Sequence, residues 1–156
     1  MRKKFALALY EIMREDEDIM LITGDVGYGM LDRIRDDFPT QFINAGAAEQ
    51  CMMDMAVGIH YSGKLPIVYS ITPFLLYRPF ETIRNYIDHE NVPVIMVGSG
   101  RDNDYRDEGF SHDASDHDII RNFKNIQFIT PEGDFDLREI IYSGKPTYLN
   151  LKRIVN

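Results

Sequence analysis

Cysteine and long apolar runs are nearly missing from this sequence of 156 residues. The one cysteine, Cys51, excludes an internal disulfide and any metal site built from several thiolates, which suits a reducing compartment. We expect Cys51 to lie in the core. No apolar stretch is long enough to span a bilayer. The N-terminal apolar run is interrupted by Glu11, so it predicts a helix rather than a secretory signal, and we expect a cytoplasmic protein.

Positive charge is also in deficit. The chain has 17 lysines and arginines against 25 aspartates and glutamates, which gives a net charge of −8. Nucleic acid and anionic membranes are polyanions that select basic surfaces, so they are excluded as expected partners. A small polar molecule or another protein fits this balance better.

The usual short motifs of nucleotide and hydrolase sites are missing as well. The glycine-rich stretch 24–29, GDVGYG, is not followed by Gly-Lys-Ser/Thr and does not have the spacing of GxGxxG. No GxSxG or HExxH occurs. The acidic and histidine residues of segment 112–118 allow a metal site, but such residues in a polar loop are more often solvated, so we predict no metal.

What the sequence does contain is a regular alternation of apolar strands and amphipathic helices. Hydrophobic residues make up 44% of the chain, enough for one core. Strands are expected within 18–25, 42–44, 65–71, 91–100, 125–131 and 146–151, with helices between them. This order predicts an α/β fold, three layers (α/β/α) with a mostly parallel sheet, in a single domain spanning 1–156.

Segment 41–85 organises the rest of the chain. Its pattern predicts a strand, a tight turn, a helix that is apolar nearly all round, a strand, a polar-aromatic loop and a further helix. Glu49 is the one carboxylate at the start of the apolar helix. From the residues alone, Glu49 is either a cap for the first helical amides or a functional group.

Unusual polar residues gather where the predicted strands end. Parallel strands end at one edge of the sheet, and ligands of such sheets bind there. We therefore expect a site for a small polar ligand, with Phe74 and Tyr77 as aromatic walls. The polar residues in question are Asp25, Glu49, Arg78, Glu108, His112, Asp116 and His117. Residues 101–118 are nearly free of aliphatic side chains, and this length of loop suggests function.

Four stretches of the sequence resemble the pyrimidine-binding domain of transketolases, and the resemblance covers essentially the whole chain. The pattern resembles bacterial transketolase-like proteins made from separate subunits and, more distantly, the deoxyxylulose-phosphate synthases. The stretches are INAGAAEQ at 43–50, SGKLPIVYSITPFLLYRPFETIRN at 62–85, VGSG at 97–100 and GFSHDASDHDIIRNFKNIQFITP at 109–131.

The resemblance implies thiamine diphosphate (thiamine pyrophosphate) as cofactor. Glu49 matches the family's glutamate that hydrogen-bonds a ring nitrogen of the aminopyrimidine and thereby activates the cofactor. Such a role needs a carboxyl group shielded from water, and an apolar helix start provides that shielding. Phe74 matches the aromatic residue that packs on the pyrimidine ring, Tyr77 lies beside it, and Asp25 matches an aspartate near the cofactor.

The resemblance also implies a substrate pocket. His112 matches a histidine that touches substrate oxygens, so it is a predicted catalytic and substrate-binding residue. Glu108 stands where the family has an aspartate that holds a substrate hydroxyl. Arg2 and Arg78 match phosphate-binding arginines, whose planar fork suits a phosphate.

One expected motif is missing, and this implies a partner. The family binds the diphosphate and its Mg²⁺ through GDG followed by an asparagine on another domain, whereas this chain has only GDV at 24–26. We therefore expect a transketolase-like transferase subunit that is active with a separate diphosphate-binding subunit, as a two-plus-two heterotetramer. It would transfer a two-carbon ketol unit from a sugar or sugar phosphate.

Several alternatives remain open at this stage. The chain could serve a thiamine-diphosphate-dependent 2-oxo acid decarboxylase or an enzyme like deoxyxylulose-phosphate synthase. It could also be a catalytically silent pairing subunit, although a silent subunit has no need of Glu49, Phe74 and His112. Gly29 and Phe110 replace a serine and a proline of the family pattern, and Glu108 replaces an aspartate, so a ketose other than the usual sugar phosphate is an equal alternative.

Overall fold

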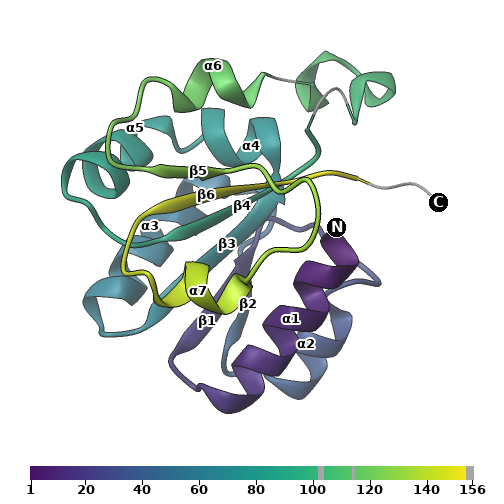
Figure 1. The fold of residues 1–156 in the computed structure, drawn as a ribbon, viewed down its shortest axis with the longest axis vertical. Coiled ribbons are helices and arrows are strands. Elements are labelled where there is room, and N and C mark those ends of the chain that lie inside the picture. The colour runs from purple at the N-terminus through teal and green to yellow at the C-terminus, as the bar shows by residue number, and fades with distance from the viewer. Residues whose placement is uncertain (102–103, 114, 154–156) are drawn as a thin grey trace.

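The computed structural model describes residues 1–101, 104–113 and 115–153. Its centre is a six-stranded, wholly parallel sheet with strand order β2-β1-β3-β4-β6-β5 (Figure 1). The strands are β1 (Ile19–Thr23), β2 (Phe42–Asn44), β3 (Leu65–Ile71), β4 (Ile95–Ser99), β5 (Gln127–Ile129) and β6 (Thr147–Leu151). All six match predicted strands, and the sheet is entirely rather than mostly parallel.

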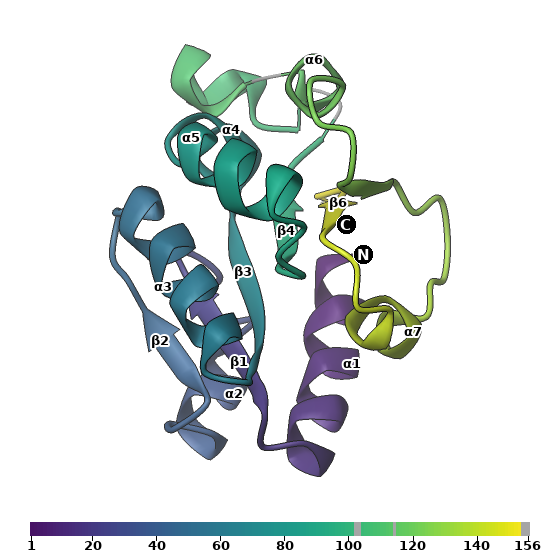
Figure 2. The same ribbon diagram turned by 90° about the vertical axis from the view of Figure 1, so that its left-hand side faces the viewer.

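Helices cover both faces of this sheet. Figure 2 shows α1 and α7 on one side and α3, α4, α5 and α6 on the other. The helices are α1 (Arg2–Glu15), α2 (Asp32–Asp37), α3 (Glu49–Tyr61), α4 (Thr72–Tyr77), α5 (Phe80–Thr82), the π-helix η1 (Ile83–His89), α6 (Asp116–Ile120) and α7 (Leu137–Tyr142). None of the helices in the described part of the chain is long and apolar enough to cross a membrane.

Two apolar clusters hold the layers together, one on each face. Neighbouring strand residues point to opposite faces, so Leu21 joins the cluster with α1, α2 and α7, while Ile22 joins the cluster with α3, α4 and α6. The same alternation is seen at Val97 and Met96 of β4. Strands buried on both faces need apolar side chains at every position, which explains their continuous apolar runs. The predicted three-layer α/β fold is confirmed.

The prediction of a polar-aromatic loop after β3 is wrong, because residues Thr72–Tyr77 form helix α4. Pro73 lies in the first helical turn, where its missing amide costs nothing and its fixed φ angle favours the helix. Leu75 and Leu76 are fully buried in the cluster with α3. Burial of these two leucine side chains outweighs the preference of Thr72 and Pro73 for a loop.

The expected core position of Cys51 is also wrong. Cys51 is exposed, because α3 buries one face rather than its whole circumference. The buried face carries Met52, Met53 and Ala56, and the outer face carries Cys51, Asp54 and Gly58 at helical spacing. Asp54 marks the outer face in the sequence, so Cys51, three residues before it, lies on the exposed side.

The described residues of the polar segment 101–118 form short helical turns. It contains the 3₁₀ helices η2 (Arg106–Glu108) and η3 (Phe110–His112), and α6 begins at Asp116. Residues 102–103 and 114 lie outside the described residues. The segment follows β4, so it lies at the edge where the strands end, as Figure 1 shows.

Gly98 is the tightest position in the central strands, and it provides a test of the packing. A Cβ atom there would lie 2.5 Å from Tyr148 Oη and 2.8 Å from Thr72 Oγ1. We expect Gly98→Ala to lower the free energy of unfolding by about 1–3 kcal/mol in urea denaturation, because the added methyl group overpacks a filled site.

Gly58→Ala is the matched control, since nothing lies within 4 Å of its Cβ position on α3. Alanine favours the helix there, so this variant should gain about 0.5–1 kcal/mol. Equal free energies for the two variants would contradict the packing described here.

Candidate active site

Glu49 is the centre of the candidate site, and its carboxylate is turned toward the sheet. It is the first residue of α3, and its side chain is 1% exposed. Glu49 Oε1 accepts a hydrogen bond of 2.9 Å from Ser70 Oγ on β3, and Oε2 accepts one from Arg78 Nη1. Among the described residues, no side-chain hydrogen bond caps the start of α3. The capping interpretation of Glu49 is therefore not supported by the geometry.

Gly24, the residue after β1, packs directly against this carboxylate. A Cβ atom at Gly24 would lie 2.9 Å from Glu49 Oε1 and 3.0 Å from Ser70 Oγ. Any larger residue would press on the carboxylate. The absence of a side chain at Gly24 therefore lets the Glu49 carboxylate lie against the end of β1.

Arg78 links Glu49 to two other predicted site residues. Its Cζ lies 3.9 Å from the centroid of the Phe74 ring, so the guanidinium stacks on that aromatic face. The His112 ring also packs on Phe74, with centroids 4.9 Å apart and planes at 67°. Glu49, Arg78, Phe74 and His112 thus form one connected group from α3, α4 and η3. Tyr77 is 55% exposed beside it.

A second group lies at the end of β4. Arg2 Nη1 donates to Ser99 Oγ at 3.1 Å and to Tyr105 Oη at 2.9 Å. Glu108 accepts a hydrogen bond of 2.9 Å from Arg153, whose guanidinium lies over the Tyr105 ring. Tyr105 and Arg153 were not predicted. The only signal for Tyr105 was that an aromatic residue is rare in so polar a stretch.

Asp25 belongs to a third, exposed group. Its backbone has a φ of 58°, the left-handed conformation that aspartate tolerates in turns. Asp25 accepts hydrogen bonds from the Tyr28 hydroxyl and, at 3.1 Å, from Asn44 Nδ2, and these bonds lower the pKa of its carboxyl group. The described hydrogen bonds of Glu49 go to Ser70 and Arg78 instead. Asp25 therefore flanks the site rather than joining its central group.

Asp116, predicted to lie in a solvated loop, is buried instead. It accepts hydrogen bonds from Tyr148 Oη at 3.1 Å and from Asn150 Nδ2, which tie the start of α6 to β6. Burial raises the pKa of the Asp116 carboxyl group. His117 packs on Phe128 with ring centroids 4.8 Å apart. In the described residues, no group of three or more histidine, cysteine, aspartate or glutamate side chains could hold a metal ion.

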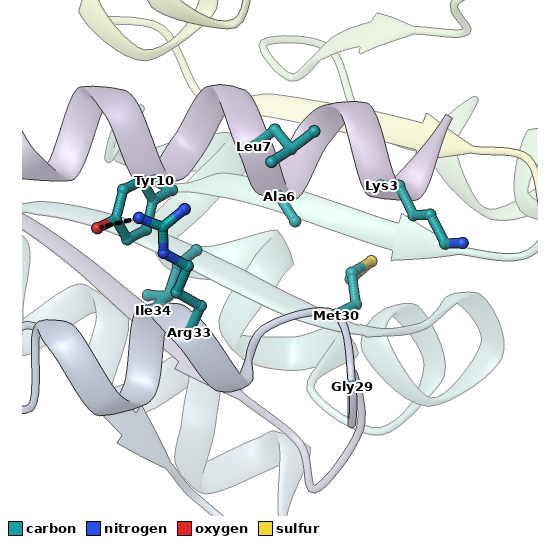
Figure 3. Close-up of a pocket in the computed structure, with 8 residues that line it drawn as sticks. All are labelled: Lys3, Ala6, Leu7, Tyr10, Gly29, Met30, Arg33 and Ile34. Carbon is teal, nitrogen blue, oxygen red and sulfur yellow. Dashed lines mark hydrogen bonds between the residues drawn. The ribbon is translucent and has the colours of Figure 1, made fainter.

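A separate pocket of about 220 Å³ lies between α1 and α2 (Figure 3). Ala6, Leu7, Met30 and Ile34 are among the residues that line it, with Lys3 and Arg33 at the rim. The lining residues come from α1, α2 and the turn before α2, and the predicted site residues that the structure describes lie elsewhere. This pocket is therefore distinct from the group around Glu49.

Comparison with known proteins shows which family this chain belongs to. The family model "Transketolase, pyrimidine binding domain" matches residues 1–151. This chain belongs to that family. The sequence resemblance is therefore confirmed, and the Glu49 group is the part of a transketolase pyrimidine-binding domain that lies at the carboxyl edge of its sheet.

Three relatives illustrate the match. A putative transketolase C-terminal section from Methanocaldococcus jannaschii is 29% identical over 98% of this chain and 50% of its own length. A subunit of an apulose-4-phosphate transketolase from Actinobacillus succinogenes is 30% identical over 74% of this chain and 39% of its own length. A solved structure, described as an inactive β4 tetramer of a split-gene transketolase, is 28% identical with a TM-score of 0.80.

The match to that structure includes 97% of this chain and 51% of the chain in that structure. This pyrimidine-binding domain thus spans about half the length, or less, of the relatives described here. The fold and the family are shown by these comparisons. The roles of Glu49, Phe74, Tyr77, Asp25 and of the substrate residues stay predictions.

The buried Asp116 predicts a particular pH dependence. Its pKa is raised in the folded domain, so the folded state keeps a proton that the unfolded chain loses above about pH 4. Stability is therefore lost as the pH rises from there through the raised pKa, by about 1.4 kcal/mol for each unit of the shift. In Asp116→Asn this loss is absent, so the free energy of unfolding of the variant minus that of the wild type should increase as the pH rises from about 4 through the raised pKa of Asp116.

Asp118→Asn is the control for this series, because Asp118 is exposed on the same helix and pairs with Arg121. The difference for Asp116→Asn should change more with pH than that for Asp118→Asn, because Asp116 is the buried carboxyl group of the two. A constant difference for Asp116→Asn would contradict a raised pKa of Asp116.

Proposed function

We propose that this chain supplies the aminopyrimidine half of a thiamine diphosphate site, in a transketolase-like transferase completed by a second subunit. The observation that carries the proposal is the buried carboxylate of Glu49 beside the ring of Phe74, at the ligand-binding edge of a transketolase pyrimidine-binding domain. A solvent-shielded carboxylate next to an aromatic face suits a flat, protonatable heterocycle.

The residues present fit the pyrimidine part of this cofactor. Gly24 has no side chain, and a Cβ atom at that position would crowd Glu49 Oε1. Ser70 orients the carboxylate by donating to one oxygen. The other oxygen, which here accepts from Arg78, can accept from a protonated ring nitrogen once the guanidinium moves away. Phe74 offers an aromatic face for stacking close to the carboxylate, because the guanidinium of Arg78 contacts both the Phe74 ring and Glu49.

The bound cofactor would supply a carbon nucleophile that attacks the carbonyl group of a ketose. The chain's own part is proton transfer and positioning. Glu49 holds or releases a proton at the pyrimidine ring nitrogen, and burial keeps water from competing for it. Phe74 and Tyr77 bound the ring, and Asp25 flanks it. His112, in edge contact with Phe74, would donate to substrate oxygens.

The diphosphate and its Mg²⁺ are assigned in this proposal to a partner subunit, because the chain lacks the GDG…Asn motif. Two findings support a split enzyme. One relative is named as a subunit of a transketolase, and the similar solved structure is described as an inactive tetramer of a split-gene transketolase. A two-plus-two assembly in the cytoplasm is the arrangement we propose for the active complex.

The proposed reaction is transfer of a two-carbon ketol unit from a sugar or sugar phosphate, as part of carbohydrate metabolism. Arg2, Arg78 and Glu108 complete the proposed substrate pocket with His112. In the structure these side chains bind protein groups, as when Arg2 donates to Ser99 and Glu108 accepts from a neighbouring arginine. Substrate would compete with these contacts for the same donors and acceptors.

Assembly provides the first test of this function. The isolated chain should bind thiamine diphosphate weakly, because the metal and diphosphate ligands are on the partner, and binding should appear on mixing with that subunit. Titration calorimetry with Mg²⁺ measures both cases. Tight, Mg²⁺-dependent binding to the chain alone would refute the split site.

Glu49→Gln tests the role of the central carboxyl group. Glutamine keeps the size of the side chain but cannot exchange a proton with the pyrimidine ring. We expect hydrogen–deuterium exchange at the cofactor's C2 position, measured by NMR in the assembled complex, to slow by about 100-fold or more. Assembly and far-UV circular dichroism should be unchanged.

His112→Ala is the matched variant, because His112 also contacts Phe74 but is assigned to substrate rather than to cofactor. C2 exchange should stay close to that of the wild type, while ketol transfer falls. Testing ketose phosphates against pyruvate as donors then separates transketolase chemistry from a synthase or decarboxylase. Normal C2 exchange in Glu49→Gln would remove the basis of the proposed function.

A further inference from the structure

Arg78 makes the contacts that the proposed function expects of an aminopyrimidine ring. Its guanidinium is flat, stacks on the face of Phe74 with Cζ 3.9 Å from the ring centroid, and donates from one edge to Glu49 Oε2. A bound pyrimidine would also stack on Phe74 and, with its ring nitrogen protonated, donate to Glu49. The arginine and the ring therefore compete for one aromatic face and one carboxylate oxygen.

We propose that Arg78 is a built-in occupant of the pyrimidine site, which closes that site in the free subunit and must move out when the cofactor binds. The inference rests on the proposed function, and it adds a regulatory contact to it. The hydrogen bond of Arg78 to Glu49 would then be present in the empty site and broken when the cofactor is bound.

The charge of Glu49 explains why such an occupant is useful. A carboxylate that is 1% exposed needs a partner, because burial of an unpaired charge is costly. In the free subunit Ser70 satisfies one oxygen and Arg78 the other. A ring N–H of the cofactor can replace the guanidinium, so the carboxylate exchanges one donor for another and is not left unpaired.

The position of Arg78 allows this movement. It follows the last residue of α4 and precedes Pro79, and its side chain is 42% exposed although its guanidinium reaches a buried carboxylate. The side chain is thus open to solvent on one side. Rotation about its own bonds can carry the guanidinium toward the rim, where it would be available to an anionic group of the substrate.

Competition of this kind has a measurable cost in affinity. When the competent state is only a fraction of the population, the apparent dissociation constant rises by the inverse of that fraction. Thiamine, which lacks the diphosphate, and its pyrimidine fragment, 4-amino-5-hydroxymethyl-2-methylpyrimidine, are probes of this site that need no metal. Their affinity for the free subunit should be limited by Arg78.

The experiment measures binding of both probes to the isolated chain by NMR titration, for the wild type, Arg78→Gln and Arg84→Gln. Arg84 is the matched control, an exposed arginine on η1 that hydrogen-bonds Asn85. Arg78→Gln should bind the probes about tenfold more tightly or better, and Arg84→Gln should equal the wild type. The gain should disappear in the double variant Glu49→Gln, Arg78→Gln.

Arg78→Lys is a second variant, in case loss of the charge beside Glu49 disturbs folding. It keeps the charge but has no flat group to stack on Phe74, so its affinity for the probes should lie between the wild type and Arg78→Gln. Unchanged or weaker binding by both Arg78 variants, including no binding by any variant, would overturn the occupant role. The proposed function fails separately, through normal C2 exchange in the assembled Glu49→Gln complex.

Discussion

The buried carboxylate of Glu49 is the constraint on which the rest of the site depends. A charged group shielded from water must have its oxygens satisfied, and the fold does this with one hydroxyl from β3 and one guanidinium from the residue after α4. Gly24 has no side chain that would press on the carboxylate, and Phe74 provides a flat wall against the guanidinium that binds it. Each of these features either pairs with the carboxylate or makes room for it.

The parallel sheet makes this arrangement possible. β1, β3 and β4 end at one edge, so Gly24, Ser70 and Ser99 come close together although they are far apart in the sequence. α6 is held at the same edge by Asp116, which accepts hydrogen bonds from two side chains of β6. The segment that carries His112 is therefore attached to rigid structure at its far end. Precision at the edge comes from these buried polar contacts.

Much of this was accessible from the sequence, for identifiable reasons. Continuous apolar runs such as 65–71 predict buried parallel strands, and Glu49 was found because a carboxylate interrupts an apolar helix start within a motif. The helix at Thr72–Tyr77 was missed because burial of its two leucines is a tertiary effect. The burial of Asp116 depends equally on packing partners. No local pattern indicated that the guanidinium of Arg78 would both stack on a ring and bind a carboxylate.

The central claim is that Glu49 binds the ring nitrogen of the cofactor's pyrimidine while Phe74 packs on its face. The most direct measurement is an experimental structure of the assembled complex with thiamine diphosphate and Mg²⁺. The account predicts a carboxylate–nitrogen distance of about 2.6–3.0 Å at Glu49 and a guanidinium of Arg78 that has left Phe74. A pyrimidine ring bound elsewhere, with Arg78 still paired to Glu49, would contradict it.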